Sequence, residues 1–265
     1  PTAPAHPVDR LRRGFLATPF PADRKIRLER GVRMSIYNRY NPSPEYREMV
    51  EMYATLHEKG ADKAPGTTNE DEHRPPEQTF AGKMLASHAP TVKTMIERTG
   101  AKSLLDYGAG KGQSYKQKDI QIGSVVAPTI KEYWGLDEIR CYDPGYEPFN
   151  QLPSEQFDAV ISTDVLEHIT EPDLPWILDE LFSYARCFVF ANIACYPAKK
   201  SLPNGQNAHC TVRPPEWWMG MIHAVAMRHT DVSYQFSLAT RTGAKKVLGL
   251  AGKRSLDHHT CERWA

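Results

Sequence analysis

The sequence predicts an α/β fold with an open, mostly parallel sheet, and three observations lead to this expectation. Short apolar runs that end at glycine, proline or acidic residues recur after residue 101, as buried parallel strands do. Residues 174–185, between two of these runs, have the apolar spacing of a helix. Two further strand-like runs, at 232–240 and 245–250, are separated by a turn that suits an antiparallel hairpin. Alternating strands and helices with a closing hairpin are typical of an α/β sheet with an antiparallel edge.

The expected parallel strands are residues 103–107, 139–143, 157–162 and 187–194. Asp173 is placed to cap the helix that precedes the last of them. The short, proline-containing segment 144–156 leaves no room for the helix and strand of a further crossover, so that element is expected to be missing. By contrast, the connection between the first two strands is longer than needed, and residues 117–129 are interpreted as an insertion.

Ahead of the sheet, the sequence indicates two other zones. Residues 1–33 form a basic Pro/Arg-rich arm, which could be solvated, dock on an anionic partner or join two copies as a homodimer. Residues 34–100 form a helical cap or lid, with one helix beginning at Pro44 and a second at about 80–98, broken near Pro90 and capped by Gly100. Residues 101–265 are the remaining, ligand-binding domain.

Composition narrows the class of partners. Thirty-three basic and 32 acidic side chains leave a formal net charge of +1, which gives no global attraction to nucleic acid. The sequence contains no long apolar run that would span a membrane and no secretory signal at its start, so neither a membrane nor export is expected. The five cysteines are scattered and form no C-x-x-C pair. A reducing, cytoplasmic location and no metal site are the corresponding expectations.

The strongest motif follows the first predicted strand. Residues 106–112 read Asp-Tyr-Gly-Ala-Gly-Lys-Gly, and glycines so closely spaced let a backbone turn sharply and approach a ligand. A dinucleotide fingerprint has the spacing G-x-G-x-x-G, whereas the spacing here is G-x-G-x-G with an acid two residues earlier. In this pattern the sequence resembles the class I methyltransferases that depend on S-adenosyl-L-methionine (SAM). Residues 157–168, ending Asp-Val-Leu-Glu-His, resemble the fourth strand and loop of the small-molecule members.

The resemblance spans residues 102–251 and implies a Rossmann-like class I methyltransferase fold with SAM as cofactor. Asp143, at the end of the second predicted strand, is placed to accept hydrogen bonds from ribose hydroxyls, and Asp106 would lie near the methionine ammonium. The expected cofactor-binding residues are Asp106, Gly108, Gly110, Gly112, Asp143, Leu152, Asp164 and Val165. Leu152 is chosen as the residue that packs on the adenine.

Two histidines are the candidate catalytic bases. His168 ends the Asp-Val-Leu-Glu-His motif and, with an ordinary pKa near ~6.5, could accept a proton from the acceptor. Equally, Glu167 and His168 could only shape the loop and cap the next helix. His209 is the second candidate, and a metal at His209 and Cys210 is not expected, because no third ligand lies at a suitable spacing.

The segment after residue 194 and the helical cap supply the candidate substrate contacts, which are Tyr37, Tyr40, Tyr196, Arg213 and Trp217. Arg213 could bind a carboxylate or phosphate, and a tryptophan could stack on the acceptor. Equally, Pro215 could open a helix that places Trp217 in the core. For Trp217 and Trp218, one is expected in the core and the other in the cleft.

These observations predict methyl transfer from SAM to an O, N or S atom of a small-molecule acceptor. Two other functions are also compatible with the sequence. A catalytically silent SAM-binding regulatory module would carry the same cofactor motif, and an NAD(P)-dependent oxidoreductase would need the third glycine one residue later. Turnover with an acceptor would separate an enzyme from a silent module.

Overall fold

The computed structural model describes residues 37–62, 73–80, 82, 84–241 and 255–265. The predicted basic arm at 1–33 and the predicted strand at 245–250 lie outside these residues. Residues Tyr37–Ala265 form one compact unit.

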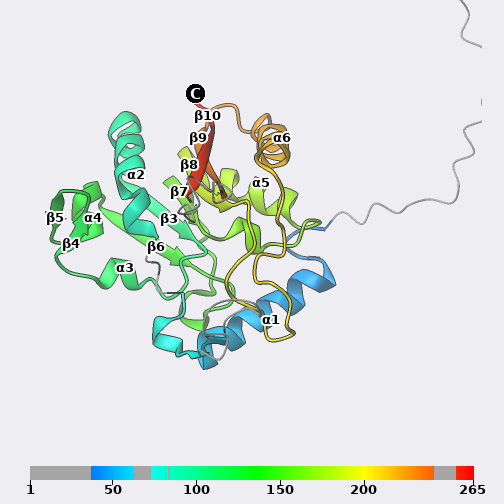
Figure 1. Cartoon of the computed structure of the whole chain (residues 1–265). Helices are drawn as coiled ribbons and strands as arrows, with labels where there is room; N and C mark the ends of the chain where they lie inside the picture. The colour runs from blue at the N-terminus through cyan, green and yellow to red at the C-terminus, as the bar shows by residue number, and fades with distance from the viewer. Residues whose placement is uncertain (1–36, 63–72, 81, 83, 242–254) are drawn as a thin grey trace, which may run out of the picture. The chain divides into compact units, whose positions relative to one another are not determined.

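A six-stranded sheet with the order β10-β9-β8-β7-β3-β6 forms the centre of this unit (Figure 1). Its strands are β3 (Ser103–Tyr107), β6 (Glu138–Tyr142), β7 (Phe157–Thr163), β8 (Ala185–Ala194), β9 (Ser233–Arg241) and β10 (Leu256–Arg263). Neighbouring strands are parallel except β10, which pairs antiparallel with β9. The predicted α/β class, with a mostly parallel sheet and an antiparallel C-terminal hairpin, is confirmed, and the architecture is Rossmann-like. The second hairpin strand, however, begins only at Leu256.

The two irregular connections were also predicted correctly. Residues 144–156, all of which the structure describes, contain a single 3-10 turn (Glu147–Phe149) and no strand, so β6 has β3 as its one partner among the described strands. Residues in the expected insertion form a separate antiparallel hairpin of β4 (Ile120–Ile122) and β5 (Val125–Ala127), which α4 (Ile130–Trp134) follows.

Helices cover both faces of the sheet because successive strand residues point to opposite sides. Leu104 lies in the core beneath α2 (Leu85–Thr99) and α4, whereas Leu105 lies in the core beneath α5 (Leu174–Tyr184) and α6 (Pro215–Ala226). Figure 1 shows these helices on the two sides of the strands.

Helix α2 continues through Pro90, where a break was expected. Ala89 and Val92, on either side of the proline, are fully buried. Their packing holds this turn against the sheet although proline removes one backbone hydrogen bond. Gly100 ends the helix in the left-handed conformation, as predicted. Helix α2 therefore packs in the core against one face of the sheet.

Helix α1 (Pro44–Lys59) runs across the end of the sheet (Figure 1). The buried carboxylate of Asp173 fastens it there. The backbone N–H and the hydroxyl of Ser43, at the start of α1, both donate to Asp173, at 3.0 and 2.5 Å. Thr170 and Trp176 also donate to this carboxylate. Asp173 does precede α5, but among the described residues its side chain makes no capping bond to that helix. Asp173, which was predicted to cap α5, thus holds the start of α1 in place.

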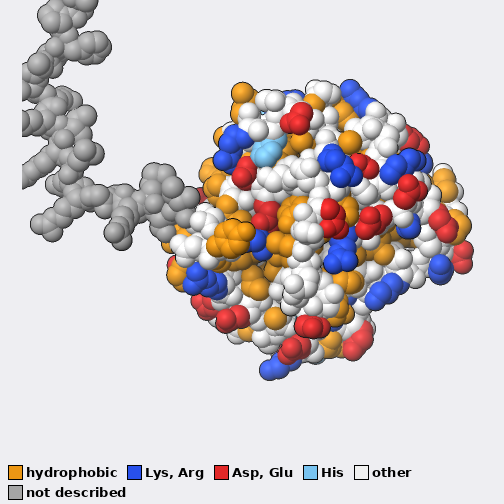
Figure 2. All heavy atoms as spheres, turned by 180° about the vertical axis from the view of Figure 1, so that it is seen from behind, with side chains coloured by type: hydrophobic (Ala, Val, Ile, Leu, Met, Phe, Trp, Pro, Cys, Tyr) orange, Lys and Arg blue, Asp and Glu red, His pale blue; other side chains and the backbone are white. Residues whose placement is uncertain are grey.

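The shorter elements are β1 (Ala61–Asp62), β2 (His73–Arg74), a 3-10 turn at Pro76–Gln78, α3 (Gln113–Lys116) and a 3-10 turn at Leu166–His168. None of the helices described here combines the length and apolar character that crossing a bilayer requires. On the face drawn in Figure 2, basic and acidic side chains are interspersed and do not gather into a patch of one sign.

Replacing Asp173 by Asn should destabilise the protein by about 1.5–3 kcal/mol, the range for hydrogen bonds to a charged group. Burial alone would raise the pKa of Asp173, but the hydrogen bonds from Ser43, Thr170 and Trp176 outweigh it and lower the pKa. The stabilisation is therefore present above the ordinary carboxyl pKa of 3.8 and is lost as the pH falls through the lowered value. Urea unfolding at pH 7 and at acid pH measures both effects, with the exposed Asp137→Asn as control. Equal stability of the two variants at pH 7 would contradict the role of Asp173.

Candidate functional site

A cavity of about 890 Å³ lies at the carboxyl edge of the parallel strands. Asp106, Asp143, Asp164 and Ala194, each at or just after a strand end, line its floor. Helix α1 contributes the residues of its inward face, which are Tyr46, Met49, Val50, Tyr53, Leu56 and His57. Ligands in open α/β sheets bind at this edge, so the cavity is the candidate functional site.

The glycine loop forms one wall of the cavity and needs glycine at each of its three positions. Gly108, Gly110 and Gly112 all have φ between +55° and +88°. A Cβ on Gly108 would lie 2.3 Å from a methyl group of Val165, and one on Gly110 would lie 2.9 Å from the carbonyl oxygen of Phe80. The tight turn expected of the closely spaced glycines is thus present, while their approach to a ligand stays a prediction.

Asp143 closes the next strand and is held by the glycine loop. Its carboxylate accepts hydrogen bonds from the N–H groups of Gly110, at 2.8 Å, and Gly145, at 2.9 Å. Burial raises the pKa of Asp143, and these two bonds partly offset the rise. Each carboxylate oxygen retains acceptor capacity.

Asp106 is buried at the end of β3 and is only half satisfied. One carboxylate oxygen accepts from the hydroxyl of Tyr115 at 2.7 Å, while the other has no partner in the part of the chain that the structure describes. Burial raises the pKa of Asp106 to about 7. A cationic or hydrogen-bond-donating ligand group beside the free oxygen would favour its charged form.

The pKa of Asp106 makes stability depend on pH. A carboxyl whose pKa is raised on folding stabilises the protein below its unfolded pKa, and that contribution is lost as the pH rises toward 7. Between pH 4 and 7 the wild type should therefore lose unfolding free energy relative to Asp106→Asn, by up to about 1.4 kcal/mol per pH unit. Urea unfolding across this range measures the difference, and Asp137→Asn should stay parallel to the wild type. Parallel curves for Asp106→Asn would refute the raised pKa.

Asp164 and Val165 lie between β7 and the histidines, and both line the cavity. Asp164 has a φ of +55°, which is uncommon for a residue with a side chain. A pair of hydrogen bonds to Asn192 on β8 holds it there, because the Asp164 N–H donates to the side chain of Asn192 and the Asn192 amide donates back at 2.5 Å. Left-handed backbone at a cavity is typical of a functional constraint.

His168 and His209, the two predicted bases, lie side by side with ring centroids 4.7 Å apart. Nδ1 of His168 is 2.7 Å from the carbonyl oxygen of Ala208, and Nδ1 of His209 is 2.5 Å from that of Tyr196. A carbonyl oxygen only accepts, so each Nδ1 carries the proton and each Nε2 keeps its lone pair. The hydroxyl of Tyr53, on α1, also contacts Nδ1 of His168, at 2.5 Å.

Burial favours the neutral forms of both histidines. Burial, followed by the neighbouring His209 ring and then the charge of Lys200, lowers the pKa of His168 to about 3. Burial also lowers the pKa of His209. A general base works best when its pKa is near the operating pH, and the roles of His168 and His209 as proton acceptors stay predictions.

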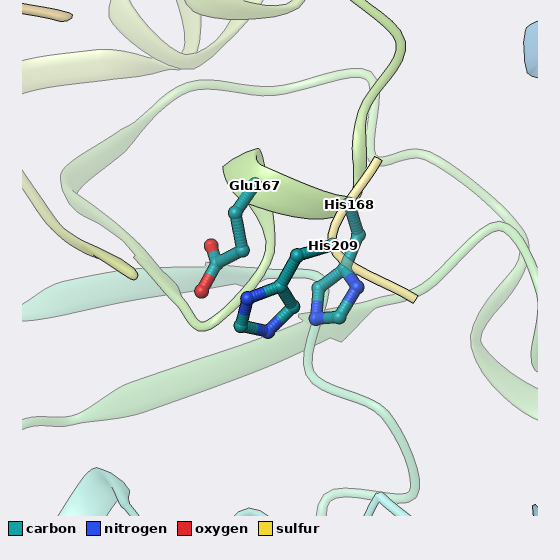
Figure 3. A group of neighbouring side chains, drawn as sticks. All are labelled: Glu167, His168 and His209. Atoms are coloured by element: carbon teal, nitrogen blue, oxygen red, sulfur yellow. The ribbon is translucent and has the colours of Figure 1, made fainter. Parts of the chain in front are cut away.

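Glu167 completes this group and is fully buried. Its carboxyl accepts from the N–H of Ala194 at 3.0 Å through one oxygen, and the other oxygen is unpartnered within the described residues. Burial, with a further contribution from the charge of Asp164, raises the pKa of Glu167 to about 8. The Glu167 side chain points toward the histidine rings (Figure 3).

Five expected site residues do not line the cavity within the described part of the chain, and these are Tyr37, Tyr40, Leu152, Arg213 and Trp217. Tyr40 is 96% exposed in the turn before α1. Leu152 packs on the core beneath α5 and not beside the glycine loop. Arg213 pairs with Glu171 at the surface and lies over the ring of Trp217. Trp218 is the tryptophan that lies in the core, as one of the pair was predicted to do. Trp217, however, does not line the cavity.

The other expected residues meet at the cavity, since the three glycines, Asp106, Asp143, Asp164, Val165, His168, Tyr196 and His209 all line it. Tyr115 and Glu167 were not among the candidates. The helical spacing of Met49, Tyr53 and His57 could have marked one face of α1 for the cavity. No comparable signal marks Tyr115, because its hydroxyl reaches Asp106 only through the turn of the glycine loop.

An alanine at position 108 should be worse tolerated than one at position 100. Both glycines have left-handed backbone, which costs an ordinary residue about 1–2 kcal/mol, but a Cβ at Gly100 meets nothing within 4 Å. Gly108→Ala should lose a further 1–3 kcal/mol or so from overpacking against Val165. Urea unfolding compares the two, and adding Val165→Ala should recover part of the loss at position 108. Equal destabilisation by the two substitutions would argue against the contact.

No model of a known protein family matches this sequence, and no curated protein matches it. The functional argument therefore depends on the residues of the cavity.

Proposed function

We propose that the protein is a class I SAM-dependent methyltransferase that acts on a small-molecule acceptor. The observation that carries this proposal is the meeting of the glycine loop, Asp106 and Asp143 in one cavity at the carboxyl edge of a Rossmann-like sheet. The acid-x-Gly-x-Gly-x-Gly motif and the acid at the end of the next strand come from separate parts of the sequence. In the structure they form one wall, joined by the hydrogen bond from Gly110 to Asp143.

The cavity fits the polar groups of SAM. The free oxygen of Asp106 offers a carboxylate to the ammonium of the methionine moiety. Asp143 retains lone pairs for ribose hydroxyls beyond its two bonds to backbone N–H groups. The glycine loop supplies the close backbone approach. A volume of about 890 Å³ lies near the upper end of the range for small-molecule sites.

When bound, the cofactor supplies a methyl group on a positively charged sulfur. The residues of the chain contribute binding, orientation and exclusion of water. Met49 and Tyr53 of α1 cover the cavity opposite the strand ends. Asp106 and Asp143 fix the two ends of the cofactor, and Tyr196, His168 and His209 line the remaining wall, where an acceptor would lie.

Calorimetric titration of SAM, S-adenosylhomocysteine and NADH into the full chain tests the proposal. The adenosyl ligands should bind, and Asp143→Ala should weaken them at least about tenfold, which is about 1.4 kcal/mol. Asp137→Asn, an exposed carboxyl outside the cavity, should bind as the wild type does. Binding of NADH without the adenosyl ligands would refute the proposal. Adenosyl binding that Asp143→Ala leaves unchanged would refute the assigned site.

A further inference from the structure

Glu167, His168 and His209 bring three metal-ligating groups together from two separate loops (Figure 3). Each can offer one ligand atom, and these atoms all lie within 4.8 Å of one another. Glu167 and His168 follow β7, and His209 lies in the connection between β8 and α6. All three line the cavity.

The hydrogen bonds of the histidines leave the right atoms free for a metal. Both Nδ1–H groups donate to backbone carbonyl oxygens, those of Ala208 and Tyr196. A histidine that binds a metal through one ring nitrogen almost always donates the other N–H to a carbonyl or carboxylate, which fixes the ring and its tautomer. The hydroxyl of Tyr53 adds a second contact behind His168.

Glu167 provides an independent observation. Its side chain is fully buried, and the oxygen that does not bind Ala194 finds no protein partner in the described ranges. A buried carboxyl oxygen without a partner is destabilising by about 1–3 kcal/mol. Coordination to a cation would satisfy it.

We propose that Nε2 of His168, Nε2 of His209 and a carboxylate oxygen of Glu167 bind one divalent transition-metal ion. Two imidazoles and a carboxylate suit Zn²⁺ or Fe²⁺ rather than Mg²⁺ or Ca²⁺. Bonds to such ions are about 2.0–2.2 Å long, so ligand atoms that lie up to 4.8 Å apart would draw closer together on binding. Three protein ligands leave at least one coordination position open, and that position faces the cavity.

Some neighbouring charges would favour a cation at this site, and others would oppose it. Asp164 is near enough for its negative charge to raise the pKa values of Glu167 and His209, and it would attract a cation. Lys200 and Arg241 carry positive charges that lower the pKa values of the histidines. The same charges would repel a bound cation. Removing the charge of Lys200 should therefore strengthen metal binding.

The role of the open position, unlike the metal site itself, rests on the proposed function. An oxygen ligand bound to such an ion has a lowered pKa, so an acceptor hydroxyl at this position would lose its proton to solvent more readily. The metal would thus supply the activation, while His168, whose Nε2 would bind the ion, would not itself serve as the base. The corresponding substrate class is a small molecule with a hydroxyl group.

Titration of Zn²⁺ and Co²⁺ into the full chain, first stripped with a chelator, tests the metal site. Calorimetry should show one saturable Zn²⁺ site, and Co²⁺ should give visible absorption bands from nitrogen and oxygen ligands. His168→Ala, His209→Ala and Glu167→Gln should each weaken binding at least about tenfold, whereas Lys200→Met should tighten it. His259→Ala, on the exposed face of β10, should leave binding unchanged. Cys210→Ser should do so too, because the Cys210 thiol contacts the His168 carbonyl and not the cluster.

Absence of saturable Zn²⁺ binding in the wild type would overturn the inference. Zn²⁺ binding that survives all three ligand substitutions would also overturn it, since the ion would then occupy another place. A loss of binding counts as support only where the variant keeps the thermal unfolding midpoint of the chelated wild type within a few degrees. Titrating S-adenosylhomocysteine in parallel separates the two proposals, because metal binding without adenosyl binding would refute only the proposed function.

Discussion

Three carboxyl groups, those of the buried Asp106 and Glu167 and the partly buried Asp143, lie at one edge of the sheet, and their need for partners governs the organisation of the site. Removing a carboxylate from water is unfavourable unless hydrogen bonds or a cation replace its hydration. The protein satisfies Asp143 with two backbone N–H groups but leaves one oxygen of Asp106 and one of Glu167 without a partner within the described residues. A ligand that reaches these oxygens would stabilise the folded state as it binds.

The remaining structure holds these groups in place. Parallel strands end at the same edge, so residues distant in sequence share one floor. Helix α1 is fastened over that floor near both of its ends. Arg39, ahead of the helix, pairs with Glu180 and donates to the hydroxyls of Tyr107 and Tyr142. At the other end, Lys111 of the glycine loop donates to the carbonyl oxygens of His57 and Pro76.

The sheet and the floor of the site could be predicted from the sequence because strand periodicity and glycine spacing are local signals. The same holds for Asp106, Asp143 and the glycines, whose positions follow directly from the strand ends. The cluster of Glu167 and the two histidines could not be assembled in this way. His209 reaches it through the long connection after β8, and no local pattern reports how such a loop folds back.

Substrate contacts were the least predictable part. Tyr40 and Trp217 were chosen for their chemistry, but the turn before α1 and the packing of α6 decide where they point. Tyr53 shows the opposite case. Its helical spacing indicates only a buried face, and the position of α1 across the strand ends, secured by Asp173, brings its hydroxyl to His168.

The short connection between β6 and β7 has a consequence for the outer border of the sheet. Because no described strand follows β6 on its far side, one row of its backbone N–H and C=O groups has no sheet partner among the described strands. Such a border can recruit a strand from another molecule and start aggregation. Glu138 and Arg140, with Ile139 between them, place charges at the first and third residues of β6. Charged side chains on a short border strand are a common protection against this self-association.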